Sequence, residues 1–518
     1  MYDCIVVGAG LSGLYCAWRL KQEGYRVLVL ERLGRIGGRI KTQKIEVKGQ
    51  TYIYEAGAQR FSNAHERVIN LILKLGLSKH MRSYHDPSET HYVEAIPHPK
   101  PASRIEPSSR NLIQQLINKA KALNPKHKQA NTTEAIGEEL MGPEFIRDLI
   151  KYSGYDLGIT AKDYYDYENY YKAMNDEHFF DFEGGLLTLC EHLAKGLECH
   201  LGEALIDFSY EAQTYTVLAK TTKGKYFGRR LILALPRSAL LKLPALDSLE
   251  TSLRAVSTNT YMRIYAIYPR NADGHYWFED LPKLVTDSHI RQIIPEVGAE
   301  ADNGLIQLSY SDGRHAEIWF NYAMSELLKP VIHTELRRMF PNKVIPDPIY
   351  FQSHYEKEGT HYWLPNNSSA QHYEKVLQPL EAPVYICGEA YSHYQGWMEG
   401  ALETAEEAID RVMNKTQTQG ASTKANGRRN KLLRGGGDED LPLYTLEEVA
   451  KHNNRSDAWI ALDGFVYDVT KWIPQHPGGD EILRCIGKDG TATFNSIGHP
   501  SYVIETVRPQ YRIGRLHQ

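Results

Sequence analysis

The segment Tyr2–Arg32 constrains the fold more than any other part of the chain. Its apolar run Cys4–Val7 is followed at once by the glycine-rich hexapeptide Gly8-Ala9-Gly10-Leu11-Ser12-Gly13, and Leu14–Glu23 then carries helix-forming residues. A second apolar run, Arg26–Leu30, follows the helix. This order predicts a strand, a tight turn, a helix and a second parallel strand, which together form a βαβ unit.

The glycine spacing predicts a dinucleotide site in that unit. Gly8 would permit the turn, Gly10 would let the backbone approach a pyrophosphate, and Gly13 would let helix and strand pack closely. The N-terminus of the helix would then face the phosphates. Glu31, at the end of the second strand, is placed to accept hydrogen bonds from a ribose diol. The alternative is a plain strand-to-helix turn in an α/β domain.

A second glycine-rich loop, Gly34-Arg35-Ile36-Gly37-Gly38-Arg39, could wrap another phosphate with its backbone N–H groups and with the charge of Arg39. Together with the hexapeptide and with Glu55-Ala56-Gly57-Ala58-Gln59-Arg60, this loop resembles the flavin-dependent amine oxidase family. That family includes monoamine, polyamine and L-amino-acid oxidases. The resemblance implies that the dinucleotide is FAD rather than NAD.

A distant block extends the resemblance. The apolar strand Val384–Cys387 precedes Gly388-Glu389, and Gly396-Trp397-Met398-Glu399-Gly400-Ala401 leads into the helical run Leu402–Met413. In the resembling family, this helix points its N-terminus at the flavin pyrimidine ring, where a helix dipole stabilises negative charge. The resemblance places Glu389 near the ribityl chain and pyrophosphate, the Met398 backbone near the isoalloxazine, and Trp397 on the substrate side. The alternative for Trp397 is a packed core aromatic.

The cofactor-binding residues predicted from these motifs come from both ends of the catalytic region. They are Gly8, Gly10, Leu11, Ser12, Gly13, Glu31, Arg32, Gly38, Arg39, Gly57, Ala58, Gln59, Arg60, Gly388, Glu389, Trp397 and Met398.

Four residues are predicted to act on the substrate side: Arg60, Trp397, Arg263 and Tyr362. In L-amino-acid oxidases an arginine in a similarly placed Gly-x-x-Arg segment pairs with the substrate carboxylate, a task that suits a bidentate guanidinium. The alternative is that Arg60 stabilises the flavin loop. Tyr362 or Trp363 would face Trp397 across the substrate slot, with core packing as the alternative.

Two features depart from the family pattern. Many members carry a lysine linked through water to flavin N5, and the best alignment places Arg263 there. Since arginine does not readily release its proton, a dioxygen-activating role is weakened, which would suit a flavin that reduces a haem. The covalent-flavin cysteine of monoamine oxidases also has no counterpart near Gly359–Trp363, so FAD is expected to be non-covalent.

The motifs of the C-terminal segment indicate a separate domain. The strand pattern Asp463–Thr470 is followed by His476-Pro477-Gly478-Gly479, and a second histidine stands at Gly498-His499-Pro500. Two imidazoles in proline-containing turns can ligate one haem iron from opposite sides. The module resembles cytochrome b5 throughout its length, which implies haem b with His476 and His499 as the iron ligands.

A chain of 518 residues suggests about two to four domains. We expect an α/β FAD-binding Rossmann-type domain with an interleaved α+β substrate domain, plus a small α+β cytochrome b5-like domain. Within the substrate domain, helices are expected at Ser109–Leu123 and Thr133–Tyr152, and strands at Tyr261–Tyr268, Leu305–Tyr310 and Glu317–Tyr322. The expected boundaries are 1–80, 181–249 and 376–413 for the FAD-binding domain, 81–180 and 250–375 for the substrate domain, 414–440 for a flexible linker, and 441–518 for the haem-binding domain.

Composition limits the partners. A net charge of −4 gives no global reason to expect nucleic acid, and the six scattered cysteines suggest neither a zinc site nor a disulfide framework. The first strand begins too early for a signal peptide, and no apolar run reaches the length of a membrane helix. We therefore expect a soluble cytoplasmic protein without an integral membrane anchor. A homodimer is possible on this evidence.

The linker 414–440 contains a cluster of basic residues. We expect this cluster to belong to a solvated tether, with a nuclear-import or acidic-partner patch as the alternative.

The sequence thus predicts an enzyme that oxidises the CH–NH bond of a small-molecule amine. An L-amino acid is favoured, and polyamine or monoamine oxidation is the alternative. The electrons would pass to dioxygen, to the tethered haem or to a redox-protein acceptor. A different class is an FAD/haem electron-transfer protein that supplies a desaturase or hydroxylase, and a third is a scaffold with vestigial cofactors.

Overall fold

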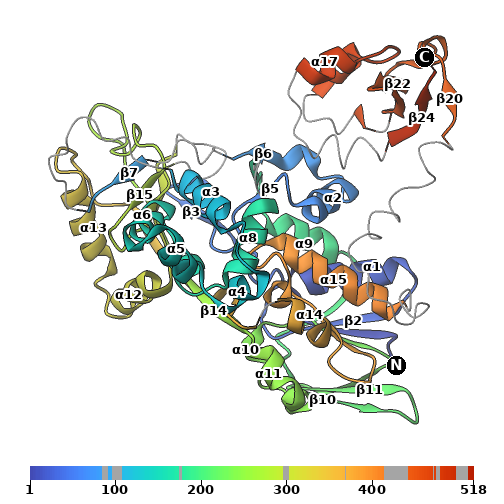
Figure 1. Ribbon diagram of the computed structural model, residues 1–518, viewed down its shortest axis with the longest axis horizontal. Helices are drawn as coiled ribbons and strands as arrows, with labels where there is room; N and C mark the ends of the chain where they lie inside the picture. Colours follow the sequence, from blue (N-terminus) through green and yellow to red (C-terminus); the bar gives the residue numbers. More distant parts are fainter. Residues whose placement is uncertain are drawn as a thin grey trace. The chain divides into compact units, whose positions relative to one another are not determined.

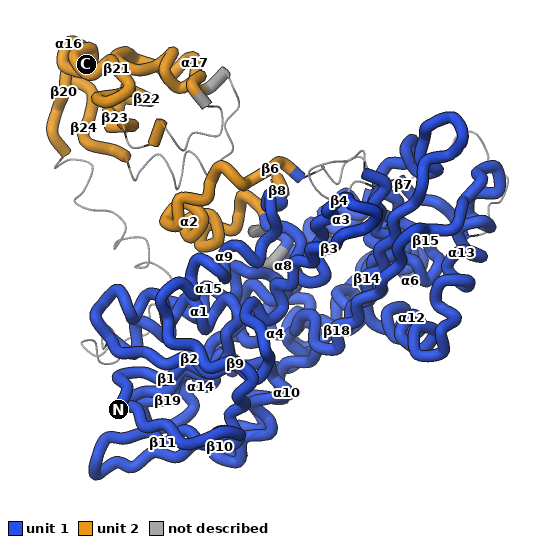
Figure 2. The backbone as a smooth tube through the Cα atoms, turned by 180° about the vertical axis from the view of Figure 1, so that it is seen from behind, with its two compact units in different colours: residues 1–61, 84–175, 181–413 blue, residues 62–83, 176–180, 414–518 orange. Residues whose placement is uncertain are grey.

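The computed structural model describes most of the chain, in two compact units. The described residues are 1–84, 91–95, 108–173, 178–295, 303–367, 369–413, 441–470, 472–473, 479–496 and 511–517. Figure 2 colours the larger unit, residues 1–61, 84–175 and 181–413, apart from residues 62–83, 176–180 and 414–518. The predicted domain boundaries stay a prediction.

A five-stranded parallel sheet confirms the expected Rossmann-type fold. Its order is β19-β13-β1-β2-β9, with β1 (Cys4–Val7) in the centre. Ile5 pairs with Leu28 of β2 (Val27–Glu31) on one side and with Leu231 of β13 (Leu231–Leu233) on the other. The outer strands are β9 (Glu198–Leu201) and β19 (Val384–Ile386). The strand order therefore reverses at β1, and in α/β sheets ligands bind at the carboxyl end of that position.

Both faces of this sheet are covered. Helix α1 (Leu11–Gln22) lies beside α9 (Leu187–Ala194) and α15 (Met398–Val412), as Figure 1 shows. On the opposite face Ile5, Leu28 and Leu231 pack against Phe208 and Val217 of an antiparallel sheet. That sheet has the order β10 (Leu205–Glu211), β11 (Thr216–Thr221), β12 (Lys225–Gly228).

The glycines of the first turn are required by close packing. Gly8 has φ +107°, and a Cβ there would lie 2.3 Å from the Ala234 carbonyl oxygen. A Cβ at Gly13 would lie 1.9 Å from the Gly8 carbonyl oxygen, so helix α1 meets β1 only because both residues lack side chains. A Cβ at Gly10 would instead meet nothing closer than the Gly38 Cα, at 3.9 Å. Gly10 therefore borders open space.

The long strand β14 (Val256–Ile267) forms the centre of a second sheet, flanked by β17 (Leu305–Asp312) and β18 (Tyr350–Trp363). This sheet confirms the expected strands at Tyr261–Tyr268 and Leu305–Tyr310, although β14 begins earlier than expected, at Val256, and β17 extends to Asp312. The strand expected at Glu317–Tyr322 was wrong, because those residues belong to helix α12 (Gly313–Met324). Ala316 and Trp319 share its buried stripe, which has the helical spacing of three residues rather than an alternation.

A helical layer precedes this sheet in sequence. Helix α3 (Ser109–Ala120) lies within the expected range, but the helix expected at Thr133–Tyr152 is divided into α5 (Thr133–Met141) and α6 (Pro143–Ser153). Gly142 ends α5 at φ +89°, and Pro143 begins α6 without an N–H group to donate. In α8 (Tyr164–Ala173), Tyr164 and Tyr167 lie in the apolar core of this layer.

The remaining elements of the larger unit are short or peripheral. They are β3 (Thr42–Val47), β4 (Gln50–Glu55), β5 (Phe61–Ser62), β7 (His91–Val93), α4 (Pro125–Ala130), α7 (Leu157–Thr160), β8 (Phe179–Phe182), α10 (Arg237–Leu240), η3 (Pro244–Leu249), α11 (Glu250–Leu253), β15 (Leu284–Thr286), β16 (Gln292–Ile293), α13 (Leu328–Met339), α14 (Ser369–Leu377) and η4 (Glu389–Tyr391), where β5 and β8 each cross a boundary between the two units.

The C-terminal part of the smaller unit is built on a sheet of order β20-β24-β23-β22-β21. Ile460, Val466 and Trp472 are buried in it. The elements of the smaller unit are α2 (Glu66–Lys74), η1 (Ser78–His80), β6 (Met81–Ser83), β20 (Leu443–Tyr444), α16 (Leu446–Val449), β21 (Asn453–Asn454), β22 (Asp457–Leu462), β23 (Phe465–Asp468), η8 (Gly479–Arg484), α17 (Thr491–Ser496) and β24 (Arg512–Leu516). Among the helices described in either unit, none has the length and hydropathy needed to cross a bilayer.

The two inner glycines should respond differently to alanine. Gly13→Ala forces an overlap with the Gly8 carbonyl and should lower the free energy of unfolding by about 1–3 kcal/mol. Gly10→Ala should leave stability within about 0.5 kcal/mol but weaken FAD binding at least about tenfold, because its methyl group enters the space expected for pyrophosphate. Urea unfolding of the apoprotein and fluorescence titration with FAD measure the two effects, with Gly224→Ala as a control in open space. Equal loss of stability in both variants would contradict this assignment.

Candidate functional site

The first turn of α1 has an open approach. Its N-cap, Gly10, has no side chain to cap the helix and borders open space, toward which the first-turn N–H groups can donate. The Glu31 carboxylate accepts hydrogen bonds from Ala9 N (2.8 Å) and Leu33 N (2.7 Å), which leaves each oxygen a second acceptor position for a ribose hydroxyl. These features fit the FAD pyrophosphate and ribose. Of the other predicted residues, Leu11 and Ser12 are buried, whereas Arg32 is exposed.

The second glycine loop lies directly against the first turn. Gly37 N donates to the Ala9 carbonyl oxygen at 2.8 Å, and a Cβ at Gly38, which has φ +58°, would approach the Gly10 Cα to 3.2 Å. Arg35 secures the loop by donating to the carbonyl oxygens of Ile36 (3.1 Å) and Gly38 (2.9 Å). The loop is thereby held beside the expected phosphate position.

Arg39 reaches across to Glu389. Arg39 Nη1 lies 2.5 Å from Glu389 Oε2, which also lies 2.8 Å from His361 Nδ1. The other oxygen, Oε1, accepts from the backbone N–H groups of His361 (2.9 Å) and Gly396 (2.6 Å). Glu389 thus joins the glycine loop, strand β18 and the turn before α15, and we call these contacts the Glu389 clamp.

The clamp keeps the Glu389 carboxylate charged. Burial alone would raise the pKa of Glu389, but the Arg39 charge, His361 and the backbone donors outweigh that effect and hold the pKa well below its usual range. All four lone-pair positions of the carboxylate are used. A direct bond from Glu389 to a ribityl hydroxyl would therefore have to displace a partner, and the geometry favours a role through Arg39 and Gly396.

The segment Gly57–Arg60 continues from the glycine loop toward the second sheet. Ala58 N donates to the Arg39 carbonyl oxygen at 2.9 Å, and a Cβ at Gly57 would lie 1.9 Å from that same oxygen. The Gln59 side chain donates to Gln307 on β17 at 3.3 Å. The Arg60 guanidinium lies over the Tyr84 ring, 5.5 Å from its centroid. Arg60 is thus carried away from the glycine loop toward the aromatic side chains of the substrate region.

The C-terminal motif brings Trp397 and Met398 to the start of α15. Trp397 is the half-buried N-cap, Met398 is buried, and the Gly388 N–H donates to Thr404 Oγ1 of the same helix at 2.8 Å. The nearest side-chain atom to a Cβ placed on the neighbouring Gly396 is Thr360 Cγ2, at 3.6 Å. Thr360 therefore borders this turn.

The two aromatic candidates on β18, Trp363 and Tyr362, differ in burial. The Trp363 indole N–H donates to the Ser392 carbonyl oxygen at 3.2 Å, and the ring is buried, which supports core packing. Tyr362 is half-buried, pairs with Ser257 of β14, and shares a strand face with Thr360. Its assignment as a substrate residue stays a prediction.

Three tyrosines gather beside Arg263, and we call Tyr155, Tyr261 and Tyr310 the tyrosine wall. The Tyr310 ring lies 5.7 Å from Tyr155, nearly perpendicular to it, and 5.4 Å from Tyr261. The Arg263 guanidinium lies 4.5 Å from the Tyr310 centroid. All three rings are half-buried, and burial raises the pKa of both Tyr155 and Tyr261. The wall is therefore accessible yet poorly hydrated.

Cations concentrate around this wall. The charge of Arg60 acts on Tyr155 and on Lys283, and burial together with Arg60 lowers the pKa of Lys283 to about 7. Among the described residues, the acids nearby include Glu55, Asp181 and Asp312. Burial raises the pKa of Glu55 to about 7 despite hydrogen bonds from Leu186 N and Thr42, so this carboxyl carries only part of a negative charge near neutral pH.

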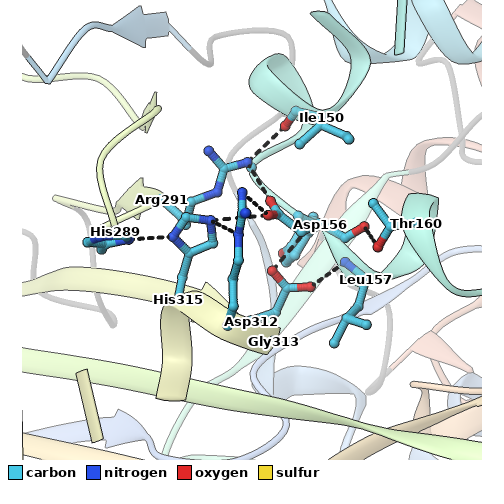
Figure 3. Close-up of polar contacts among 12 residues, drawn as sticks. Ile150, Asp156, Leu157, Thr160, His289, Arg291, Asp312, Gly313 and His315 are labelled. Carbon is cyan, nitrogen blue, oxygen red and sulfur yellow. Dashed lines mark hydrogen bonds and ion pairs between the residues drawn. The ribbon is translucent and has the colours of Figure 1, made fainter. Parts of the chain in front are cut away.

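A buried polar network positions the wall (Figure 3). The Asp312 carboxylate accepts from Asp156 N (3.1 Å) and Leu157 N (3.2 Å), which fixes the backbone next to Tyr155 against β17. Asp156 in turn lies 3.1 Å from both Arg291 Nη2 and His315 Nε2. The helical layer and the second sheet are thus joined directly behind the tyrosines.

The network ends in a histidine pair. His315 Nδ1 lies 2.8 Å from His289 Nδ1, so only one of these two nitrogens can carry a proton at a time. Burial and the His315 charge lower the pKa of His289, and Arg291 and Arg314 act in the same direction, whereas Glu335 opposes them. Protonation of both rings would break the contact.

Acid should weaken this network. Because the folded-state pKa of His289 lies below the unfolded value of about 6.5, its contribution is complete above that pH and is lost as the pH falls. We expect the free energy of unfolding to decrease by about 1 kcal/mol more in the wild type than in His289→Asn between pH 7 and pH 5. Urea unfolding followed by tryptophan fluorescence measures this difference, with the exposed His275→Asn as the control. Identical pH slopes in wild type and His289→Asn would contradict it.

Several residues of this site carry no sequence signal by themselves. Tyr261, Tyr310 and Thr360 meet because Arg263 pairs with Tyr310 and Asn259 pairs with Thr360 in the registers of β14. Lys283 and His361 are single residues outside any motif. The register of β18, which the sequence does not reveal, would have been needed to place His361.

The predicted iron ligands, His476 and His499, lie outside the described residues. Their assignment therefore stays a prediction.

Comparison with known structures supports the fold described above. A redesigned putrescine oxidase matches with a TM-score of 0.63 at 15% identity, over 80% of this chain and 99% of that chain. At this identity the likeness shows the fold.

The curated relatives match over much shorter stretches. A cytochrome b5 from Borago officinalis is 47% identical over 73 residues, 14% of this chain and 54% of that protein. Cytochrome b5 from Mus musculus is 42% identical over 86 residues, 16% and 63% respectively. An acyl-lipid (8-3)-desaturase B from Dictyostelium discoideum is 47% identical over 77 residues, and this chain spans only 16% of its length.

Two family descriptions account for most of the chain. Residues 445–517 match the cytochrome b5-like heme/steroid binding domain, which implies a haem cofactor. Residues 11–413 match the flavin containing amine oxidoreductases, which implies FAD and supports a flavin-dependent amine oxidase. The chain belongs to the flavin containing amine oxidoreductase family and carries a cytochrome b5-like domain at its C-terminal end.

Proposed function

We propose that this protein is an FAD-dependent oxidoreductase that oxidises the CH–NH bond of an L-amino acid to an imine. The observation that carries the choice of substrate is the pair of guanidinium cations, Arg60 and Arg263, at the tyrosine wall. Lys283 acts with Arg60, although its pKa of about 7 leaves it only partly charged near neutral pH. An amino acid brings a carboxylate to such a site, and a guanidinium can bind that carboxylate through two parallel hydrogen bonds.

The same charges disfavour a polyamine. A di- or polyamine needs acids to receive its second ammonium group, yet the acids near the wall are Glu55 and Asp312, whose pKa values burial raises, and Asp181. Like charges held close together in a poorly hydrated site repel strongly. Oxidation of a polyamine or monoamine is therefore the second choice, although the structural neighbour is named a putrescine oxidase.

The residues of this chain would bind and orient the substrate. Arg60 would hold the carboxylate, while Thr360 and the turn carrying Trp397 would border the reacting carbon. The glycine turn, Glu31 and the Glu389 clamp would hold FAD, which when bound supplies the hydride acceptor. Oxidation requires the amine in its neutral form, which the excess of positive charge around the wall would favour.

Arg60 can be tested by comparing substrates with and without a carboxylate. Arg60→Gln should raise the Michaelis constant for L-amino acids about 10–100-fold, because a charge-assisted pair is lost. The Michaelis constant for the matching decarboxylated amines should change less than about twofold. The control is Arg254→Gln, which removes a surface arginine paired with Glu250. An equal loss for both substrate classes would instead assign Arg60 to the flavin loop.

For the electron acceptor, we propose that the tethered b5-type haem competes with dioxygen. The family resemblance aligns Arg263 with the lysine that many members carry. Its guanidinium lies over Tyr310 and donates to the Glu55 carbonyl oxygen at 3.2 Å. The Tyr310 and Tyr265 hydroxyls raise the pKa of Arg263 although burial opposes them, so the group stays charged. A fixed cation committed to the wall is a poor substitute for a lysine that exchanges protons through water.

Restoring the lysine should therefore restore reactivity with dioxygen. In Arg263→Lys, the dithionite-reduced protein should be reoxidised by dioxygen at least about tenfold faster than the wild type, because an ammonium group would again have access to water. Stopped-flow absorbance of the flavin measures the rate without any substrate, and Arg254→Lys is the control. If the wild type already reoxidises as fast as Arg263→Lys, the haem is not needed as an acceptor.

A second candidate function follows from the C-terminal matches. One of the relatives is named an acyl-lipid desaturase and others are named cytochrome b5, so an FAD/haem electron-transfer protein that supplies a desaturase or hydroxylase is an alternative. That function would require reduction by NADH or NADPH and no turnover with amines. Mixing the oxidised protein with each reductant under nitrogen distinguishes the two functions.

A further inference from the structure

Strand β14 carries two hydrogen-bond donors on one face, Tyr261 and Arg263. Tyr261 and Arg263 are two residues apart, so their side chains leave the strand on the same side. Tyr310 packs against both, at 5.4 Å from the Tyr261 ring and 4.5 Å from the Arg263 guanidinium. The two donors therefore border one stretch of the tyrosine wall.

The hydroxyl oxygen of Tyr261 is used as an acceptor. Gly313 N donates to Asn259 Oδ1 at 3.3 Å, which fixes the orientation of that amide. Asn259 Nδ2 then donates to Asp312 Oδ2 and to the Tyr261 hydroxyl, each at 3.2 Å, and Thr360 Oγ1 donates to the same hydroxyl at 3.4 Å. Because both groups donate to the Tyr261 oxygen, the Tyr261 O–H hydrogen is used by neither contact.

Arg263 has a similar unused group. One terminal nitrogen donates to the Glu55 carbonyl oxygen at 3.2 Å, and the guanidinium plane lies against Tyr310. Its Nε–H, however, is buried and has no hydrogen-bond partner in the part of the chain that the structure describes. The residue as a whole is only 8% exposed. A buried charged donor without an acceptor is costly unless a ligand supplies the acceptor.

These donors lie beside the turn that carries Trp397. Thr360, which donates to Tyr261, is also the nearest side chain to the Cβ position of Gly396. A substrate whose reacting carbon lies at this turn would bring its other substituents against the wall. The missing acceptors are therefore expected on the substrate.

We propose that Tyr261 and Arg263 form a specificity-determining subsite for an oxygen acceptor at the end of the substrate side chain, a carboxylate or a carboxamide. The preferred substrates would be L-amino acids with acidic or amide side chains. This inference rests on the proposed function, in which Arg60 holds the α-carboxylate. With that group assigned to Arg60, two donors, one of them on the fixed cation Arg263, are left for a second acceptor.

Anion binding tests the subsite without any turnover. The full-length protein loaded with FAD is titrated with glutarate, which has two carboxylates, and with butyrate, which has one, and the perturbed flavin absorbance gives each dissociation constant. Glutarate should bind at least about tenfold more tightly than butyrate. Tyr261→Phe, which removes one hydroxyl, should weaken glutarate about tenfold and change butyrate less than about twofold.

The matched control is Tyr268→Phe, whose hydroxyl contacts His333 in the core at 3.1 Å, away from the wall. It should leave both dissociation constants unchanged, and circular dichroism verifies that each variant is folded.

Several results would overturn the subsite. They are equal affinity for glutarate and butyrate, no binding of either anion, or unchanged glutarate binding in Tyr261→Phe. An equal loss for both anions in Tyr261→Phe would reassign the hydroxyl to the α-carboxylate and would also overturn the side-chain subsite.

Turnover separates this inference from the proposed function. Anaerobic flavin reduction by L-glutamate and L-glutamine should show a Michaelis constant at least about tenfold lower than reduction by L-norvaline, with Tyr261→Phe removing the difference. Reduction by L-amino acids without such a preference would contradict the subsite alone. Failure of every amine to reduce the flavin would contradict the proposed function, while the anion titration would still decide the subsite.

Discussion

The Glu389 clamp is the interaction on which the geometry of the site depends. One buried carboxylate binds a guanidinium, an imidazole and two backbone N–H groups from parts of the chain that are far apart in sequence. Removing one partner of a buried pair typically costs about 3–5 kcal/mol, because the remaining charge is left uncompensated. The glycine loop, strand β18 and the turn before α15 can therefore take their positions only together. The cofactor site is complete only once the segment Glu389–Gly396 has packed against the glycine loop.

A second constraint shapes the substrate side. Asp312 and Asn259 use their side chains to fix the backbone beside Tyr155 and the hydroxyl of Tyr261. Because every polar atom of the Asn259 amide is used, the wall presents its remaining donors in fixed directions rather than as mobile groups. Under the proposed function, charge and donor direction, rather than shape alone, would then select the substrate.

How much the sequence could predict differs between the two halves of the site. The glycine turn was predictable because its constraint is local: Gly8 needs a positive φ, and Gly13 needs the absence of a Cβ. The family resemblance extended this prediction to Glu389 and Trp397. Tyr261 and Thr360 could not be predicted, because their meeting depends on the register between β14 and β18, which a one-residue shift would reverse. The strand wrongly expected at Glu317–Tyr322 has a different cause, since a short apolar run fits both a strand and a buried helix.

The central claim is that one chain takes electrons from an L-amino acid at the flavin site and can deliver them to its own haem. Anaerobic mixing of the full-length protein, loaded with both cofactors, with excess L-amino acid tests this claim most directly when flavin and haem absorbance are followed together. The account predicts bleaching of the flavin bands and then haem reduction, at a rate independent of protein concentration. Flavin bands that stay oxidised with every L-amino acid would contradict the account.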